Sequence, residues 1–207
     1  MHSKNIITAG KDISEAKKVL VLLHGRGANA KDILSLADHF HVDDFSLLAP
    51  QATNNSWYPY SFLAPPAQNE PWLSSALEIL SDLLEEIKSK GIALENIYFG
   101  GFSQGACLAA EFVARNANRF GGIFLFTGGL IGDKIYTENY KGDFAGSPVF
   151  IGTGNPDAHV PEERVRQTAE IMKKMNAEVT LKVYDNKPHN ISQDEIEFAN
   201  RLIFKNF

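Results

Sequence analysis

Five short segments that are apolar along nearly their whole length constrain the fold of this chain more than any other feature. These segments occupy residues 19–23, 45–49, 96–100, 122–126 and 148–152. Strands of this kind are typical of a mostly parallel sheet whose two faces are both covered by helices. A sixth segment, residues 179–183, alternates apolar and polar residues as an edge strand does. The sequence therefore predicts a single α/β domain over residues 1–207, with no linker that would divide it.

Two serine–glutamate pairs predict where helices begin. Ser75-x-x-Glu78 and Ser192-x-x-Glu195 resemble capping boxes, in which each side chain accepts a hydrogen bond from the other residue's backbone N–H. The second pair predicts a last helix that runs to about Phe207.

Composition and charge limit the partners and the cellular location that we expect for this protein. The chain is 44% hydrophobic and 22% charged, with a formal net charge of −5 and no basic cluster, so a nucleic acid is not expected as a partner. No apolar stretch follows residues 1–5, and the apolar run at residues 19–23 is far too short to span a bilayer. We therefore expect no signal peptide and no stable membrane insertion. Cys107 is the single cysteine, which makes a cytoplasmic protein the default expectation.

A G-x-S-x-G pattern follows the third apolar segment and reads Gly101-Phe102-Ser103-Gln104-Gly105. A buried strand is expected before it, and a helix over residues 106–114 is expected after it. A serine in this context occupies the sharp turn called a nucleophile elbow, which holds its hydroxyl above the edge of the sheet. Glycines flank the serine because a Cβ there would collide with the neighbouring strand or helix. Ser103 is therefore the predicted nucleophile.

The predicted base and acid follow from chain order. A histidine must accept the serine proton and a carboxylate must orient that histidine, and in this topology the three follow in the order Ser, Asp, His. Of the six histidines, only His159 and His189 follow both Ser103 and a later strand. His159 is too close in sequence to Asp157 to bond that carboxylate and the serine together, so His189 is the predicted base. Asp157 is the predicted acid, because Asp185 would have to fold back on its own loop.

The oxyanion of a tetrahedral intermediate needs two preorganised donors. We expect the backbone N–H groups of Gln104, at the start of the helix after the elbow, and of Arg26, in the glycine-rich loop after the first apolar segment. In that loop, His24 is expected to hold the backbone rather than to act in catalysis. Cys107 is expected to be a small core residue. The sequence has no spacing of metal ligands and no phosphate-binding loop, so neither a metal nor a cofactor is predicted.

The chain closely resembles the phospholipase/carboxylesterase family of α/β-hydrolases, which includes acyl-protein thioesterases and small bacterial carboxylesterases. The motifs that carry the resemblance are, in order, Leu23-His24-Gly25, Gly101-Phe102-Ser103-Gln104-Gly105, Gly154-x-x-Asp157-x-x-Val160-Pro161 and Pro188-His189. The resemblance runs from about residue 19 to the end of the chain. It implies an α/β-hydrolase fold without a large cap domain, a Ser–Asp–His mechanism on esters or thioesters, and no cofactor.

Individual residues of the family's site also have counterparts here. Ser103, Asp157 and His189 match the family's triad, and Arg26 and Gln104 match its oxyanion positions. The family's oxyanion loop typically reads L-H-G-L-G-D, so Arg26 replaces its leucine. A charged side chain at the mouth of the cleft weakens the case for a lipidated protein as substrate.

Residues 50–72 have no helical or strand periodicity and carry five aromatic side chains. Long irregular loops inside compact domains are usually functional. Ser56-Trp57-Tyr58 resembles a tryptophan motif beside the family's substrate cleft, so we expect Trp57 to contact the substrate, together with Leu130 and Ile131. The alternative is that this loop folds down over the edge of the sheet.

These observations predict a serine carboxylesterase that acts on small-molecule esters with short or medium acyl, or aryl, groups. A lysophospholipase or an acyl-protein thioesterase is the alternative enzyme, and it would need a long apolar groove. A non-catalytic ligand-binding protein on the same fold is a third reading, which predicts a lost triad residue, and none is missing. The sequence leaves the oligomeric state open, and a homodimer is compatible with it.

Overall fold

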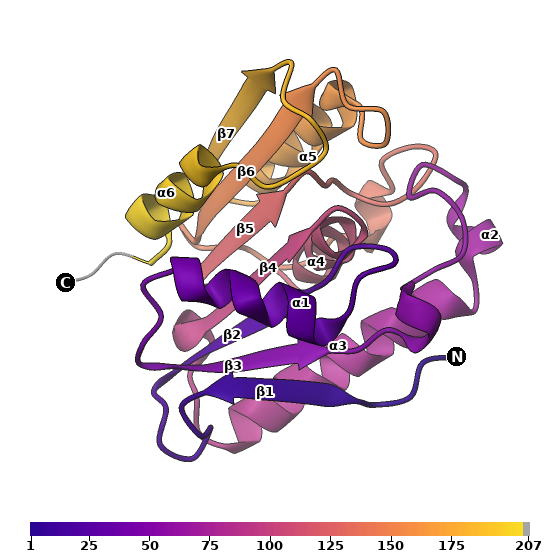
Figure 1. Ribbon diagram of the computed structural model, residues 1–207. Coiled ribbons are helices and arrows are strands. Elements are labelled where there is room, and N and C mark those ends of the chain that lie inside the picture. Colours follow the sequence, from indigo (N-terminus) through magenta and orange to yellow (C-terminus); the bar gives the residue numbers. More distant parts are fainter. Residues whose placement is uncertain (205–207) are drawn as a thin grey trace.

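The strands of the protein form one sheet, in the order β1-β3-β2-β4-β5-β6-β7 (Figure 1). The computed structural model describes residues 1–204. The strands are β1 (Ile6–Gly10), β2 (Lys18–Leu23), β3 (Phe45–Pro50), β4 (Ile97–Phe102), β5 (Gly122–Phe126), β6 (Pro148–Asn155) and β7 (Glu178–Asp185). β1 runs antiparallel to β3, and the other neighbouring pairs are parallel.

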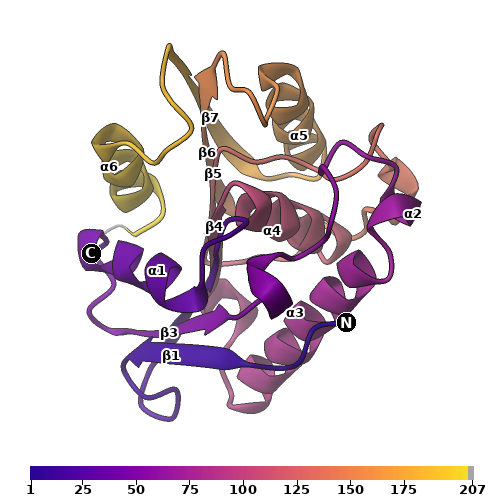
Figure 2. The same cartoon turned by 45° about the vertical axis from the view of Figure 1, so that its right-hand side comes forward.

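Helices cover both faces of this sheet, which is why its central strands are apolar along their whole length. The helices are α1 (Ala30–Leu34), α2 (Pro66–Asn69), α3 (Trp72–Ser89), α4 (Gln104–Arg115), α5 (Glu162–Lys174) and α6 (Gln193–Leu202). In β2, Val19 and Val21 belong to the core shared with α3, α4 and α5, whereas Leu20 and Leu22 belong to the core shared with α1 and α6. Figure 2 shows the sheet nearly edge-on between these two layers. The fold is that of an α/β-hydrolase, as predicted.

The two edges of the sheet differ in how well the sequence predicted them. β7 forms one edge, as its alternating pattern indicated, and its inner six residues are half-buried. β1 forms the other edge and was not predicted. Three of its five residues are exposed, and its sequence, IITAG, carries too little alternation to mark a strand.

One of the two predicted capping boxes is present. The Ser192 hydroxyl accepts a hydrogen bond from the Glu195 backbone N–H, and the Glu195 carboxylate accepts one from the Ser192 N–H at 2.8 Å. The prediction at Ser75 is wrong, because α3 begins three residues earlier, at Trp72, and the Ser75 hydroxyl accepts from the His2 backbone N–H instead. α6 ends at Leu202, and the last part of the helix expected to run to Phe207 lies outside the described residues.

The parallel order brings the carboxyl ends of β2, β4, β6 and β7 to the same edge of the sheet. The loops that follow these strands carry Arg26, Ser103, Asp157 and His189. Ligands of open parallel sheets bind at this edge. None of the helices in residues 1–204 has the length and apolar character needed to cross a membrane.

Candidate active site

Ser103 lies in the turn between β4 and α4 with a strained backbone. Its φ is +53° and its ψ is −119°, a conformation that residues other than glycine rarely adopt. A Cβ on Gly101 would lie 2.7 Å from the carbonyl carbon of Gly105, and a Cβ on Gly105 would collide with the carbonyl oxygen of Leu23. Glycine at both positions therefore lets α4 begin directly against β2 and β4. This is the elbow geometry that the sequence predicted.

A continuous chain of hydrogen bonds joins the three predicted catalytic side chains. His189 Nε2 lies 2.8 Å from Ser103 Oγ, and His189 Nδ1 lies 2.7 Å from Asp157 Oδ2. A carboxylate is an acceptor only, so Nδ1 carries the proton and the Ser103 hydroxyl donates to Nε2. Asp185 is exposed at the end of β7 and takes no part in this chain.

The Asp157 side chain is fully buried and accepts three hydrogen bonds. Oδ1 accepts from the backbone N–H groups of His159, at 2.8 Å, and Val160, at 2.9 Å, while Oδ2 faces His189. Burial alone would raise the pKa of Asp157, but these hydrogen bonds outweigh it and hold the pKa below its ordinary value. Asp157 therefore remains a carboxylate that can orient His189.

The two predicted oxyanion donors, the backbone N–H groups of Gln104 and Arg26, lie on segments that both border the cavity side of the elbow. Gln104 is the first residue of α4, where the helix dipole places partial positive charge, and Arg26 lies in the loop after β2. Within residues 1–204, the Arg26 N–H has no protein backbone acceptor, and the Gln104 N–H has none outside α4. His24 holds the Arg26 loop, as predicted: its side chain is fully buried, Nδ1 donates to the Gly25 carbonyl oxygen at 2.8 Å, and Nε2 accepts from the Ala52 N–H at 3.1 Å.

The side chains of the two oxyanion candidates have a further role that the sequence did not reveal. The Arg26 guanidinium donates to Ser56 Oγ at 3.0 Å and to the carbonyl oxygens of Pro59, at 2.9 Å, and Tyr60, at 2.7 Å. The Gln104 amide accepts from the Trp57 N–H at 3.0 Å and donates to the Tyr58 carbonyl oxygen at 2.8 Å. Both side chains therefore bind the backbone of the aromatic segment, residues 56–62.

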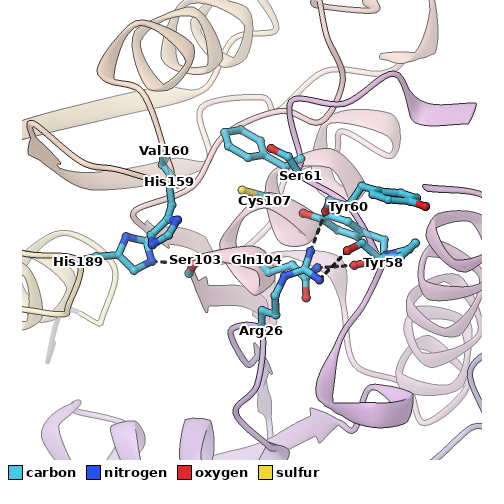
Figure 3. Close-up of a pocket in the computed structure, with 12 residues that line it drawn as sticks. Arg26, Tyr58, Tyr60, Ser61, Ser103, Gln104, Cys107, His159, Val160 and His189 are labelled. Atoms are coloured by element: carbon cyan, nitrogen blue, oxygen red, sulfur yellow. Dashed lines mark hydrogen bonds between the residues drawn. The ribbon is translucent and has the colours of Figure 1, made fainter. Parts of the chain in front are cut away.

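A cavity of about 570 Å³ opens in front of Ser103 (Figure 3). It is lined by Arg26, Tyr58, Pro59, Tyr60, Ser61, Phe62, Ser103, Gln104, Cys107, His159, Val160 and His189. Its walls are therefore the aromatic segment and the loop after β6, with the elbow between them. Among the described residues, its lining includes an arginine and two histidines but no aspartate or glutamate.

The structure corrects the prediction of substrate-contacting residues. Trp57, Leu130 and Ile131 are each at most 1% exposed, and none of them lines the cavity. The Trp57 indole N–H donates to the carbonyl oxygen of His24 at 2.9 Å, so this ring supports the aromatic segment from beneath. The backbone N–H groups of Leu130 and Ile131 bond Thr168 Oγ1 and Glu111 Oε2, which draws both residues into the core. Tyr58 and Phe62 line the cavity in their place.

Cys107 is buried, as predicted, and also lies in the lining of the cavity. Burial raises the pKa of its thiol to about 12, so the thiolate that reacts as a nucleophile is essentially absent near neutral pH. No cluster of three or more metal-binding side chains occurs in residues 1–204.

A serine elbow on a parallel sheet, with its histidine and aspartate on the loops after the last two strands, is the arrangement of the α/β-hydrolases. The sequence profile of the family described as Phospholipase/Carboxylesterase matches residues 4–206. The chain belongs to this family, and the expectation of an enzyme of the carboxylesterase class is confirmed at that level.

Known relatives agree with this assignment. The crystal structure of a phospholipase/carboxylesterase from Dyadobacter fermentans DSM 18053 is 55% identical, with a TM-score of 0.97 over 99% of this chain and 98% of that one. A carboxylesterase from Bacillus cereus is 26% identical, with a TM-score of 0.76 over 96% and 92% of the two chains. Acyl-protein thioesterase 1 of Gibberella zeae is 29% identical over 126 residues. That match covers 60% of this chain and about half, 54%, of the thioesterase.

Proposed function

We propose that the protein is a serine carboxylesterase for small esters with short or medium acyl, or aryl, groups. The observation that carries this proposal is the chain Asp157–His189–Ser103, with separations of 2.7 Å and 2.8 Å, at the wall of a cavity of about 570 Å³. Pockets of this size suit small organic ligands.

In the acylation step, Ser103 Oγ attacks the carbonyl carbon of the ester while its proton passes to His189 Nε2. Asp157 stabilises the imidazolium that results. The backbone N–H groups of Arg26 and Gln104 donate to the oxyanion on the carbonyl oxygen. The intermediate collapses when the bond to the leaving oxygen breaks and Nε2 returns its proton to that oxygen, which releases the alcohol.

In the deacylation step, a water molecule attacks the acyl carbon and gives a proton to His189 Nε2. The bond between the acyl carbon and Ser103 Oγ then breaks, and the proton on Nε2 passes to Oγ. The carboxylic acid leaves and the enzyme returns to its starting state, so that no other reactant is needed.

Three features favour a small ester over a long acyl chain. The aromatic segment closes one side of the cavity, and the Arg26 guanidinium lies at its wall. Burying a charge against a hydrocarbon chain is costly. The cavity also mixes hydroxyl, imidazole and aromatic groups rather than forming a continuous apolar groove.

Acyl-protein thioesterase activity is the second candidate, because several curated relatives carry that name. A series of p-nitrophenyl esters from acetate to palmitate, with matched alkyl thioesters, separates the two. We expect kcat/KM to be highest for short or medium oxygen esters, whereas a preference for long thioesters would favour the second candidate. A fluorophosphonate probe that failed to label Ser103 would support a non-catalytic protein. The cytoplasmic location and the homodimer stay predictions.

A further inference from the structure

A buried ion pair lies beneath the loop that carries His189. Lys187 is 8% exposed and Glu195, in the first turn of α6, is fully buried. Lys187 Nζ lies 3.2 Å from Glu195 Oε2. Lysine and glutamate are almost never buried unless they are paired. An apolar pair of similar shape is often at least as stable as a buried ion pair, so stability alone is a weak reason for these charges.

The Lys187 ammonium bonds the backbone on the far side of His189, so the chain forms a closed loop that includes the histidine. Besides Glu195, it donates a hydrogen bond to the carbonyl oxygen of Asn190. Asn190 in turn donates its backbone N–H to the carbonyl oxygen of Pro188 at 2.8 Å. Residues 187–190 are thus closed on themselves by one side chain, with His189 inside the closed segment.

Both ends of this arrangement are fixed against β6. A Cβ on Gly154 would lie 2.5 Å from the carbonyl oxygen of Lys187, and a Cβ on Gly152 would lie 2.5 Å from Glu195 Oε1. The Glu195 carboxylate also accepts from Ser192, from the N–H at 2.8 Å and from Oγ at 2.9 Å. The ion pair therefore links the histidine loop to α6 and to the strand that leads to Asp157.

We propose that Lys187 is a positioning residue for His189. By binding the carbonyl oxygen of Asn190, its ammonium fixes the backbone on both sides of the histidine and holds Nε2 within hydrogen-bond reach of Ser103 Oγ. Glu195 balances the buried charge and anchors it to α6. This inference rests on the proposed hydrolase function, since it concerns the base of that reaction.

The test uses a variant that removes the ammonium without leaving a buried charge. In K187M/E195Q, glutamine keeps an acceptor for the Ser192 cap, while Asn190 loses its donor. K187Q/E195Q, which replaces the ammonium with a shorter neutral amide, is a second variant in case the first does not fold. The matched control is K182M/D194N, because Lys182 on β7 and Asp194 on α6 form a neighbouring ion pair at 2.5 Å that is partly exposed to solvent and lies outside the histidine loop.

We expect folded K187M/E195Q to lose about 10- to 100-fold in kcat/KM for p-nitrophenyl acetate, because small displacements of a catalytic group have effects of this order. The rate at which a fluorophosphonate labels Ser103 should fall in proportion, and K182M/D194N should stay within about twofold of the wild type. E195Q alone leaves the Lys187 charge buried without its counter-charge, so it should lower both the free energy of unfolding and kcat/KM.

Two outcomes would overturn the inference. One is a folded double variant with wild-type kinetics, which would show that the pair only stabilises the fold. The other is a loss in K182M/D194N equal to that in the double variants, which would show that the contact between Lys187 and Asn190 is not the cause of the loss. A wild-type protein that neither hydrolyses esters nor labels at Ser103 would instead refute the proposed function, and this inference with it.

Discussion

Arg26 donates a hydrogen bond of 2.7 Å to the carbonyl oxygen of Tyr60, although the two residues are 34 positions apart in the chain. The residue whose backbone N–H is a candidate oxyanion donor therefore also holds the aromatic wall of the cavity. A change in this side chain acts on the shape of the cavity without removing the N–H.

The first prediction concerns this link. R26L keeps the backbone donor but frees the aromatic segment from three hydrogen bonds and removes the charge. We expect kcat on p-nitrophenyl acetate to stay within roughly several-fold of the wild type, because the backbone N–H that donates to the oxyanion is still present. We expect the optimum acyl length to shift toward longer chains. R26K separates the effect of the positive charge from the effect of the hydrogen bonds to the aromatic segment, because lysine keeps the charge but not the forked set of donors. An unchanged acyl-length profile in R26L would mean that selectivity lies in the aromatic side chains themselves.

The second prediction concerns the triad. S103A and H189A should each lower kcat by about 10⁴-fold or more, and the double variant should be little worse, because nucleophile and base act as a unit. D157N should also be severe, since an amide facing Nδ1 favours the wrong tautomer. D185N is the control and should have little effect, because Asp185 lies outside the hydrogen-bonded chain. The reverse order of the two aspartate variants would refute the assignment of the acid.

The third prediction concerns the pH dependence of hydrolysis. His189 must be neutral to accept the serine proton, so kcat/KM should be low where the imidazole is protonated and reach a plateau as pH rises. Asp157 adds no step to this rise above about pH 4, because its pKa is held below the ordinary value of 3.8. EDTA should leave the rate unchanged. Activity lost in EDTA and restored by zinc would contradict the mechanism.

The fourth prediction concerns stability in mild acid. Nε2 of His24 accepts from the Ala52 N–H and Nδ1 of His2 accepts from the Thr53 N–H, both at 3.1 Å, so both imidazoles must be neutral there. Burial lowers the pKa of each below the ordinary value of 6.5, although hydrogen bonds to backbone carbonyl groups partly offset it. The unfolded chain therefore binds protons more readily than the folded one, and stability is lost as pH falls below about 6.5.

Urea unfolding between about pH 7.5 and pH 5.5 measures this loss. H2Q should flatten the dependence of the unfolding free energy on pH, whereas H41Q, at an exposed histidine, should leave it as in the wild type. The lowered pKa of Asp157 acts in a separate window, because its contribution is lost only below about pH 4. Equal slopes in H2Q and the wild type would show that His2 does not contribute.

The sequence predicted the elements whose signals are local. The elbow depends on two glycines beside Ser103, and the strands depend on apolar runs of a few residues, so both could be recognised from the sequence. The meeting of Ser103, Asp157 and His189 could be predicted because chain order in a parallel sheet determines which loops lie at one edge. These signals do not depend on the path of any long loop.

The path of residues 50–72 could not be predicted in this way. Asn54 and Asn55 both adopt positive φ, at 54° and 57°, and they turn the chain so that Trp57 points into the core and Tyr58 lines the cavity. Aromatic content alone does not distinguish these two directions. The bonds from Arg26 to this segment and the burial of Lys187 were unpredictable for a related reason: arginine and lysine are mostly exposed, and their partners here come from folded loop geometry.

Ser103 and His189 follow strands that differ in how many neighbouring strands they have. Ser103 follows β4, which is bonded to strands on both sides, whereas the loop of His189 follows β7, an edge strand with one neighbour. Local opening of a folded protein begins where few neighbours hold the backbone. On heating, we therefore expect hydrolysis to be lost at temperatures where most of the sheet is still folded. At those temperatures the amide hydrogens of β7 should exchange with solvent while those of β4 are still protected.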